Sequence, residues 1–487
     1  MSLILTSMCI LPLLASVLIL ILPPVIGKSL SVISSALTLI LTVTLVSHGG
    51  VVESLYGWLR VDSLSLVFIL TVSLLYFLTV LFSIGYVRES RNRWTNTKYA
   101  KIFFSGINFF CWAMLMAPSV SSLALVWVAI EITTVISALL VALDDTDGAS
   151  EAAWKYVLIA SMGLGIALFA TILLYYAGAS VLGNTYDLYF PQLLTVAHKL
   201  SPVIVRLAFV LAVVGFGTKV GFVPVHTWLP DAHSEAPTPV STLLSGALLA
   251  VSFYAIMRYF QVAIVATGPA FPRNVLLAFG LASLALAALY LASQRDLKRL
   301  LAYSSIEHMG ILAIGMSFSA PIAVIGVLLH VLAHALAKGS AFFGAGTLVK
   351  KFGTKNINRI RAGVSRLPVS GPLFVLSILA LSAFPPFGIF RSEFLIVLGG
   401  FKSNASFVTI VLVLLITVAF LGFSRHGNQV MFSPPLEGGD VTKGEVSYWM
   451  TTAMVLALLG LVVLGIHPPQ QVSTLLTAAA RELSVKR

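Results

Sequence analysis

Charged residues are scarce in this chain. Asp, Glu, Lys and Arg make up 10% of its 487 residues, whereas a soluble domain carries about 25%. Hydrophobic residues make up 58%, and apolar runs of roughly 20 residues recur from end to end. No stretch is both long enough and polar enough to form a soluble domain. The composition therefore excludes a soluble enzyme with a single anchor and indicates an integral membrane protein.

Cysteines and short catalytic motifs are also nearly absent. Both cysteines, Cys9 and Cys111, lie in apolar runs, which excludes a disulfide framework or a cysteine-ligated cluster within this chain. The sequence has no CxxC, HExxH or GxSxG pattern, and no GxxxxGK followed by Ser or Thr. Nothing in it indicates covalent chemistry on a substrate, so we expect no cofactor, metal or catalytic residue in this chain.

The apolar runs divide into fourteen candidate transmembrane helices. The first lacks a basic leader and a small-residue cleavage site, and we interpret it as a retained span. The candidates cover about residues 2–23, 29–48, 63–86, 101–118, 121–143, 152–177, 202–224, 238–262, 274–292, 301–318, 321–349, 369–399, 406–424 and 447–466.

Lys and Arg predict how these spans are oriented. The net charge of +12 is more simply explained by topology signals in loops than by a nucleic-acid partner. With both termini on one side, the richest basic loops, including 88–101 and 350–366, fall on the opposite side. Cytoplasmic loops carry the excess of Lys and Arg, so we expect both termini outside.

Proline interrupts two of the spans. Span seven contains "GFVPVHTWLP" and span twelve contains "AFPPFGIF". Interrupted spans at corresponding places in two halves are typical of inverted repeats with an ion path near the middle of the membrane. The alternative is that these prolines only kink their helices.

Ionisable residues inside apolar spans are functional candidates because burying a charge in a bilayer is costly. Glu131 lies at the middle of the fifth span, and Lys219 lies late in the seventh, just before Pro224. Burial of a lysine favours its neutral form unless a carboxylate stabilises the charge, and Glu131 is the natural partner. The pair predicts a proton switch; the alternatives are a protonated, hydrogen-bonded Glu131 and a static ion pair.

A second group of ionisable residues lies in the spans that follow. His330, His334 and Lys338 are spaced four residues apart, which places them on one helical face as a plausible proton relay; a metal site there is a weaker alternative. Glu393 follows the break in span twelve and is a candidate proton exit. By position alone, Lys298 is a topology lysine beside Asp296.

Three long motifs identify a family resemblance. They are "KVGFVPVHTWLPDAHSEAPTPVSTLLSG", "DLKRLLAYSSIEHMG" and "LLHVLAHALAKGSAFFGAG". They resemble the antiporter-like proton-translocating subunits of respiratory complex I, of Mrp-type Na⁺/H⁺ antiporters and of group 4 membrane-bound hydrogenases. "EAAWKYVLIASMGLGIALF" and "YSSIEHMGI" look most similar to the F-type membrane component of hydrogenase-4, the formate-hydrogenlyase group.

The resemblance implies an all-α polytopic fold of fourteen helices, with helices 7 and 12 broken. It divides the chain into spans one to three (1–100), a first five-helix half-channel repeat (101–262), an inverted second repeat (263–424), and a loop, last span and tail (425–487). It implies a proton pathway through seven residues, among which Lys298 now takes a role in the central hydrophilic axis. The pathway consists of Glu131, Lys219, Lys298, His330, His334, Lys338 and Glu393.

The chain departs from the family at the centre of the eighth span. Many relatives carry a lysine or histidine there, whereas this chain has Ala250, with Ser241, Ser245 and Tyr254 nearby. Either water bridges the two halves or they are poorly connected. The link after span seven carries four polar residues that could gather protons, although ordinary loop polarity explains them equally well. These are His226, Asp231, His233 and Glu235.

Three functions follow from these observations. The first is a proton-translocating, non-catalytic subunit of a redox-driven complex in the plasma membrane of a prokaryote. Its partners would be other membrane subunits and peripheral redox subunits with iron–sulfur clusters and a metal or quinone site. The second is a subunit of a Mrp-type Na⁺/H⁺ antiporter, and the third is a structural membrane subunit that has lost transport. The hydrogenase-like motifs favour the first.

Overall fold

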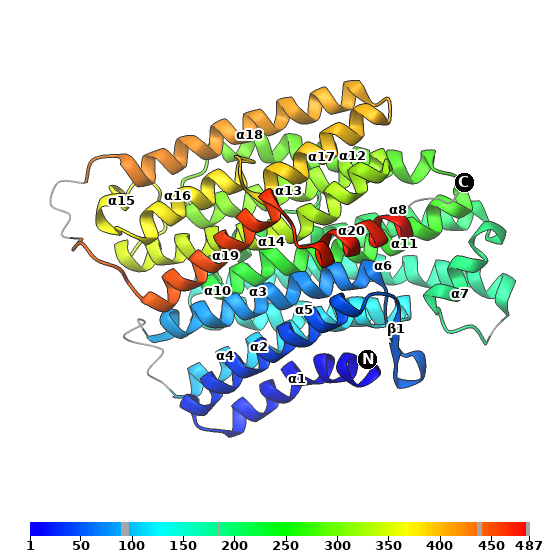
Figure 1. Ribbon diagram of the computed structural model, residues 1–487, viewed down its shortest axis with the longest axis horizontal. Helices are drawn as coiled ribbons and strands as arrows, with labels where there is room; N and C mark the ends of the chain where they lie inside the picture. The colour runs from blue at the N-terminus through cyan, green and yellow to red at the C-terminus, as the bar shows by residue number, and fades with distance from the viewer. Residues whose placement is uncertain (89–96, 184, 436–440, 484–487) are drawn as a thin grey trace.

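The computed structural model is a bundle of long helices that lie side by side along its longest axis (Figure 1), and it describes residues 1–88, 97–183, 185–435 and 441–483. Within these ranges, twelve helical segments are long and apolar enough to cross a membrane. They are α1 (Ser2–Ile21), α2 (Pro24–His48), α3 (Ser63–Arg88), α4 (Thr97–Ser119), α5 (Leu123–Val141), α6 (Asp147–Leu182), α8 (Pro202–Val220), α10 (Thr238–Leu243) continued through a π-helical turn (Leu244–Leu248) into α11 (Leu249–Thr267), α12 (Ala270–Leu291), α14 (Pro321–Phe352), α18 (Ser406–Phe432) and α19 (Tyr448–Ile466).

Two further crossings bring the number to the predicted fourteen. One is α13 (Leu297–Phe318), which is less apolar because it carries buried polar and charged side chains. The other is made of two short helices, α16 (Ser370–Leu381) and α17 (Gly388–Lys402). The polytopic helical fold inferred from the sequence is therefore confirmed.

The two predicted breaks are present. The seventh crossing stops at Val220, turns through Gly221 and resumes as α9 (Trp228–Glu235). Gly221 has φ +87°, a left-handed conformation that favours glycine. The twelfth crossing is interrupted between Leu381 and Gly388. Each break contains one cis X–Pro peptide bond, before Pro224 and before Pro386.

Two features were not among the predicted spans: a short β-hairpin and a helix at the C-terminal end of the described chain. Strands β1 (Val52–Ser54) and β2 (Leu59–Val61) form an antiparallel hairpin between α2 and α3. Each strand has three residues, too short for a period-2 hydrophobic pattern to stand out. The predicted tail contains α20 (Gln470–Leu483), which packs against α3 and α14.

The remaining short helices lie in the connections. They are 3₁₀ turns at Leu55–Gly57, Ala142–Asp144 and Ala197–Lys199, and the helices α7 (Phe190–Thr195) and α15 (Gly363–Arg366).

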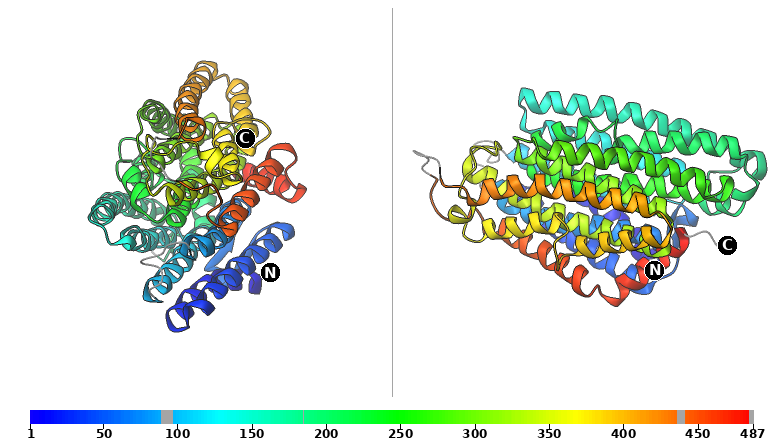
Figure 2. Two further views of the ribbon diagram at one scale, coloured as in Figure 1. Left: turned by 90° about the vertical axis from the view of Figure 1, so that its left-hand side faces the viewer. Right: turned by 90° about the horizontal axis from the view of Figure 1, so that it is seen from above.

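Helices at the centre and at the rim of the bundle differ in what they expose. The α10–α11 segment and most of α14 are buried. In contrast, α1 lies at one edge and α18 at the opposite edge, as Figures 1 and 2 show, and both expose large apolar side chains such as Leu14 and Leu414. Apolar exposure suits contact with lipid, and polar side chains are kept for the interior.

The start of α1 and the end of α20 lie toward the same end of the bundle (Figure 1), as an even number of crossings requires. The side of the membrane that they face stays a prediction. Part of the basic loop used for it, 89–96, and the terminal Lys486 and Arg487 lie outside the described residues. The division into two inverted repeats and the four proposed segment boundaries stay predictions as well.

Candidate functional site: a buried polar axis

Most of the predicted pathway residues are buried in the centre of the bundle. Lys219 comes from α8, Lys298 from the first turn of α13, and Glu393 from α17. His330, His334 and Lys338 share one face of α14 and have no exposed surface. Glu131, on α5, is only partly buried. We call this set, together with His308 of α13, the polar axis.

Lys219 is held by an aromatic hydroxyl rather than by a carboxylate. Its ammonium donates a hydrogen bond to the hydroxyl of Tyr156 on α6 and lies 4.5 Å from the centre of that ring. The Tyr156 hydroxyl also shares a 2.6 Å hydrogen bond with Ser137 of α5. The Tyr156 ring packs against Trp228 of α9, with ring centres 4.5 Å apart. Tyr156 therefore links Lys219 to α9 and to α5.

The expected ion pair between Glu131 and Lys219 is absent: among the described residues, their charged atoms do not approach within 4.0 Å. One carboxylate oxygen of Glu131 accepts a 3.2 Å hydrogen bond from Ser161 of α6, and the other is buried without a described partner. Lys219 still lies close enough to interact with the charge of Glu131, and the proton switch expected for this pair stays a prediction.

The four residues considered for proton uptake have different environments. Asp231 pairs with Arg299 at 2.9 Å and with Lys155 at 3.6 Å, and Glu235 pairs with Lys355 at 2.5 Å. These partly exposed carboxylates are neutralised by cations.

The two histidines of this group are mostly or fully buried. His233 has no described hydrogen-bond partner at either ring nitrogen and stacks on Phe342, with ring centres 5.4 Å apart. His226, in the turn of the broken crossing, also has an unpartnered ring nitrogen among the described residues. Among the described residues, no hydrogen bond or ion pair joins the four side chains to one another, and their role in proton uptake stays a prediction.

Lys298 contacts the segment that contains His233 and Glu235. Its ammonium donates hydrogen bonds to the backbone carbonyls of Ser234, at 3.2 Å, and Ala236. Asp296 caps α13 by accepting from the backbone amides of Lys298 and Arg299, and it also accepts a 2.8 Å bond from the Ser234 hydroxyl. Lys298 therefore connects the start of α13 to the link that joins the broken crossing to α10.

The eighth span places two buried hydroxyl groups near Ala250 along the chain. Ala250 is buried, and Ser245 shares a 2.7 Å hydrogen bond with Ser305 of α13. Ser241 donates to the carbonyl of His233 at 2.9 Å. Tyr254 instead bonds to Ser65 and Arg258, away from this route. Ala250, Ser241 and Ser245 are all neutral, so the eighth span carries no charge at this place.

Three helices bring histidine and glutamate side chains together in the second half. Nδ1 of His308 lies 3.1 Å from Nε2 of His330 and 3.9 Å from a carboxylate oxygen of Glu393. The other ring nitrogen of His330 bonds to Ser392 at 2.9 Å. The His334 ring lies 5.2 Å from that of His308, centre to centre.

Lys338 is buried near these residues on α14. Its ammonium donates a 2.9 Å hydrogen bond to the carbonyl of Leu301. The ammonium is not within 4.0 Å of a described carboxylate oxygen. It thus shares with Lys219 the feature of a buried cation held by a neutral oxygen.

Sequence reasoning missed His308 and Glu307, both of which are buried in α13. The signal was available, because "YSSIEHMG" places two ionisable residues well inside an apolar span. Glu307 and Glu393 line a common small pocket with Ser304, Ser382 and Phe420. Tyr156 was also missed, since a tyrosine in an apolar helix carries no distinctive pattern.

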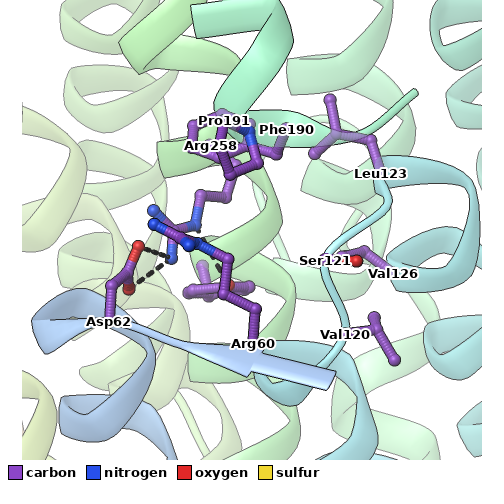
Figure 3. Close-up of a pocket in the computed structure, with 10 residues that line it drawn as sticks. Arg60, Asp62, Val120, Ser121, Leu123, Val126, Phe190, Pro191 and Arg258 are labelled. Carbon is purple, nitrogen blue, oxygen red and sulfur yellow. Dashed lines mark hydrogen bonds and ion pairs between the residues drawn. The ribbon is translucent and has the colours of Figure 1, made fainter. Parts of the chain in front are cut away.

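A second polar cluster joins Asp62, just before α3, to the buried Arg258 (Figure 3). Arg258 of α11 donates hydrogen bonds to both carboxylate oxygens of Asp62, at 2.6 and 2.7 Å, and others to Ser65 and Tyr254. Burial opposes the charged form of Asp62, but the Arg258 guanidinium outweighs it and holds the pKa of the carboxyl below its ordinary value.

Glu482 extends this cluster to α20. Its carboxylate accepts from the backbone amides of Ser63 and Leu64 at the start of α3, at 3.0 and 3.2 Å. Gln261 donates to the Glu482 carbonyl at 2.8 Å. Burial, reinforced by the nearby Asp62 carboxylate, raises the pKa of the Glu482 carboxyl. These bonds hold the last helix against the bundle, so we call the Asp62, Arg258 and Glu482 set the terminal clamp.

Comparisons with known proteins agree with this architecture. Residues 120–420 match the family described as NADH:quinone oxidoreductase/Mrp antiporter, transmembrane region. A hydrogenase-4 component F homolog from Methylacidiphilum infernorum (isolate V4) is 37% identical over 368 residues, covering 73% of this chain and 75% of the relative.

Solved structures show the same fold at low sequence identity. A chain of the Mrp complex from Dietzia sp. DQ12-45-1b has a TM-score of 0.87 at 17% identity, covering 99% of this chain and 98% of that one. A chain of respiratory complex I from Thermus thermophilus with bound NADH has a TM-score of 0.82 at 24% identity, covering 99% and 100%. These structures show the fold, and the sequence matches establish that the chain belongs to the NADH:quinone oxidoreductase/Mrp antiporter transmembrane family of antiporter-like subunits.

Proposed function

We propose that this chain translocates protons as a membrane subunit of a redox-driven complex related to complex I and group 4 hydrogenases. The observation that carries the proposal is the kind of hydrogen-bond partner that each buried lysine has. Lys219, Lys298 and Lys338 bond to hydroxyl and carbonyl oxygens rather than to carboxylates. A buried cation with no carboxylate in direct contact is costly, and a lysine held in this way can change its protonation when a partner moves.

The free energy of one hydrogen bond to a buried lysine is similar to the work of moving a proton across the membrane. Moving one charge against 100 mV costs about 2.3 kcal/mol. A hydrogen bond to a charged group contributes about 1.5–3 kcal/mol. Making or breaking one contact, such as that between Lys219 and Tyr156, is therefore comparable with the work of moving one proton across an energised membrane.

The route would run along the polar axis from the first half to the second. Glu131, Tyr156 and Lys219 form its first part, and Lys298, Ser245 and Ser305 lie where the halves meet. Lys338, the α14 histidines and Glu393 complete it. Ala250 contributes no charge at the centre, so we infer that hydroxyl groups and water carry the proton there.

Electron transfer would take place in other subunits. We propose that the complex includes other antiporter-like and small membrane subunits, together with peripheral subunits that carry iron–sulfur clusters and a metal or quinone site. The similarity to a hydrogenase-4 component F homolog supports this choice over a Mrp-type antiporter. We place the complex in the plasma membrane of a prokaryote, with both termini of this chain outside.

The proposal is tested with the intact complex in sealed vesicles. Adding the electron donor should acidify or alkalinise the lumen, and Lys219→Ala or Glu131→Gln should abolish this signal while the complex stays assembled. Lys199→Ala, in a connecting loop, is the matched control and should keep it. Unchanged translocation in both axis variants would overturn the proposal. Proton movement that requires Na⁺ but no electron donor would favour the antiporter.

A further inference from the structure

We propose that His308, His330 and Glu393 form a binding site for a divalent transition-metal ion such as Zn²⁺. The three residues come from α13, α14 and α17, and each is buried. Their ligand atoms all lie within 4.8 Å of one another. The inference concerns binding of an ion to these side chains and holds whether or not the chain moves protons.

The spacing of the donor atoms is close to that of a tetrahedral site. With metal–nitrogen distances of 2.0–2.1 Å, neighbouring ligand atoms lie roughly 3.3 Å apart. Nδ1 of His308 is 3.1 Å from Nε2 of His330 and 3.9 Å from the Glu393 carboxylate. A small movement of the Glu393 side chain toward the histidines would complete a three-residue set.

The surroundings orient the histidines for binding. Nδ1 of His330 bonds to the hydroxyl of Ser392 at 2.9 Å, which leaves Nε2 directed at His308. Metal-bound histidines usually make such a bond through their second nitrogen, because it fixes the ring and its tautomer. Nε2 of His308 has no described partner, so His308 can accept a further contact at that nitrogen while Nδ1 stays directed at His330.

The donor set selects the class of ion. Two imidazole nitrogens and one carboxylate suit Zn²⁺ and neighbouring first-row ions, whereas Ca²⁺ and Mg²⁺ require six or more oxygen ligands. Three protein ligands leave a fourth position for water. The small pocket lined by Glu307 and Glu393 adjoins the site and provides polar groups beside that position.

A bound ion would tie three helices together. It would link α17, which follows the break in the twelfth crossing, to α13 and α14. It would also occupy the side chains through which the second half of the proposed route passes. Zn²⁺ should therefore stabilise the chain and, resting on the proposed function, block translocation.

The test measures binding by the untagged full-length chain in detergent after treatment with a chelator. Equilibrium dialysis should give one Zn²⁺ per chain, and Co²⁺ should give the intense visible absorption of a tetrahedral site. His308→Gln, His330→Gln and Glu393→Gln should each abolish both signals. His334→Gln, in the same stack of rings, and His426→Gln, on α18, are matched controls and should keep them.

A thermal-stability measurement guards against variants that fail to fold. Zn²⁺ should raise the melting temperature of the wild type and both controls, and should leave that of folded triad variants unchanged. The proposal is overturned if the wild type binds no ion or only a six-coordinate Co²⁺. It is also overturned if folded triad variants bind as well as the controls. Because these readouts do not involve transport, failure of the proposed function leaves them unaffected.

Discussion

The polar axis and the terminal clamp stabilise their buried cations in different ways. In the clamp, Arg258 meets Asp62 through two hydrogen bonds, so the buried positive charge has an opposite charge in contact. In the axis, Lys219 and Lys338 meet a hydroxyl and a carbonyl. A fully paired guanidinium keeps its proton and fixes a structure. A lysine with neutral partners can gain or lose a proton at modest cost, which suits transport.

The largest expected effect tests the axis. Lys338→Met removes a buried ammonium but keeps an unbranched apolar chain of similar length. We expect translocation by the complex to fall to the background leak. The melting temperature should stay the same or rise, because no ion pair is lost and the cost of burying a charge is removed. Vesicle acidification and thermal unfolding measure the two quantities.

A Lys338→Met complex that pumps normally would remove Lys338 from the route. A large fall in its melting temperature would show instead that Lys338 has a structural role like that of Arg258. Lys402→Met, at the exposed end of α17, is the control for loss of a lysine.

The next effect tests the clamp. Asp62→Asn leaves the Arg258 guanidinium buried without its counter-charge, and breaking a buried pair costs about 3–5 kcal/mol. We expect a clear fall in melting temperature, with translocation per folded complex close to that of the wild type. The double variant Asp62→Asn with Arg258→Met should recover part of the loss. No recovery would contradict our interpretation of the pair.

A smaller effect tests whether the hydrogen bond between Lys219 and the Tyr156 hydroxyl matters, or only the nearby ring. Tyr156→Phe keeps the ring against Trp228 and Lys219 but removes the hydroxyl that accepts from the lysine. We expect a partial loss of translocation and a loss of about 1–2 kcal/mol in the free energy of unfolding. Tyr259→Phe, whose hydroxyl bonds to Thr171, is the matched control and should leave translocation unchanged.

The smallest expected effect is the contribution of Glu482 to the pH dependence of stability. Because the pKa of Glu482 is raised in the folded chain, its contribution to stability is present at low pH. That contribution is lost as the pH rises from the ordinary glutamate range through the raised value. Glu482→Gln should remove this part of the pH dependence of thermal unfolding. An identical pH profile in wild type and variant would contradict the assignment.

The two regions also show what the sequence could predict. Lys219 and the break after it were found because a charge and a proline inside an apolar run are costly and conspicuous. The fourteen crossings followed from the same apolar runs. The pairing of Arg258 with Asp62 could not be predicted, because nothing in the local sequence reveals that Asp62, far away in the chain, approaches it.

Other contacts depend on how neighbouring helices are rotated, which span positions do not define. Glu131 therefore bonds to Ser161 rather than to Lys219. His308 and Glu307 could have been selected from their positions in α13, and α20 from the apolar stripe that includes Leu476, Ala480 and Leu483. The grouping of His308 with Glu393 required the three-dimensional arrangement of α13, α14 and α17.

Proton translocation per folded complex, measured in parallel for Lys219→Ala and Asp62→Asn, tests the central claim most directly. If the axis carries protons and the clamp holds the fold, Lys219→Ala should lose translocation even in the complexes that stay folded. Asp62→Asn should lose stability and keep translocation in the molecules that remain folded. Retained translocation in a stable Lys219→Ala complex would contradict the claim.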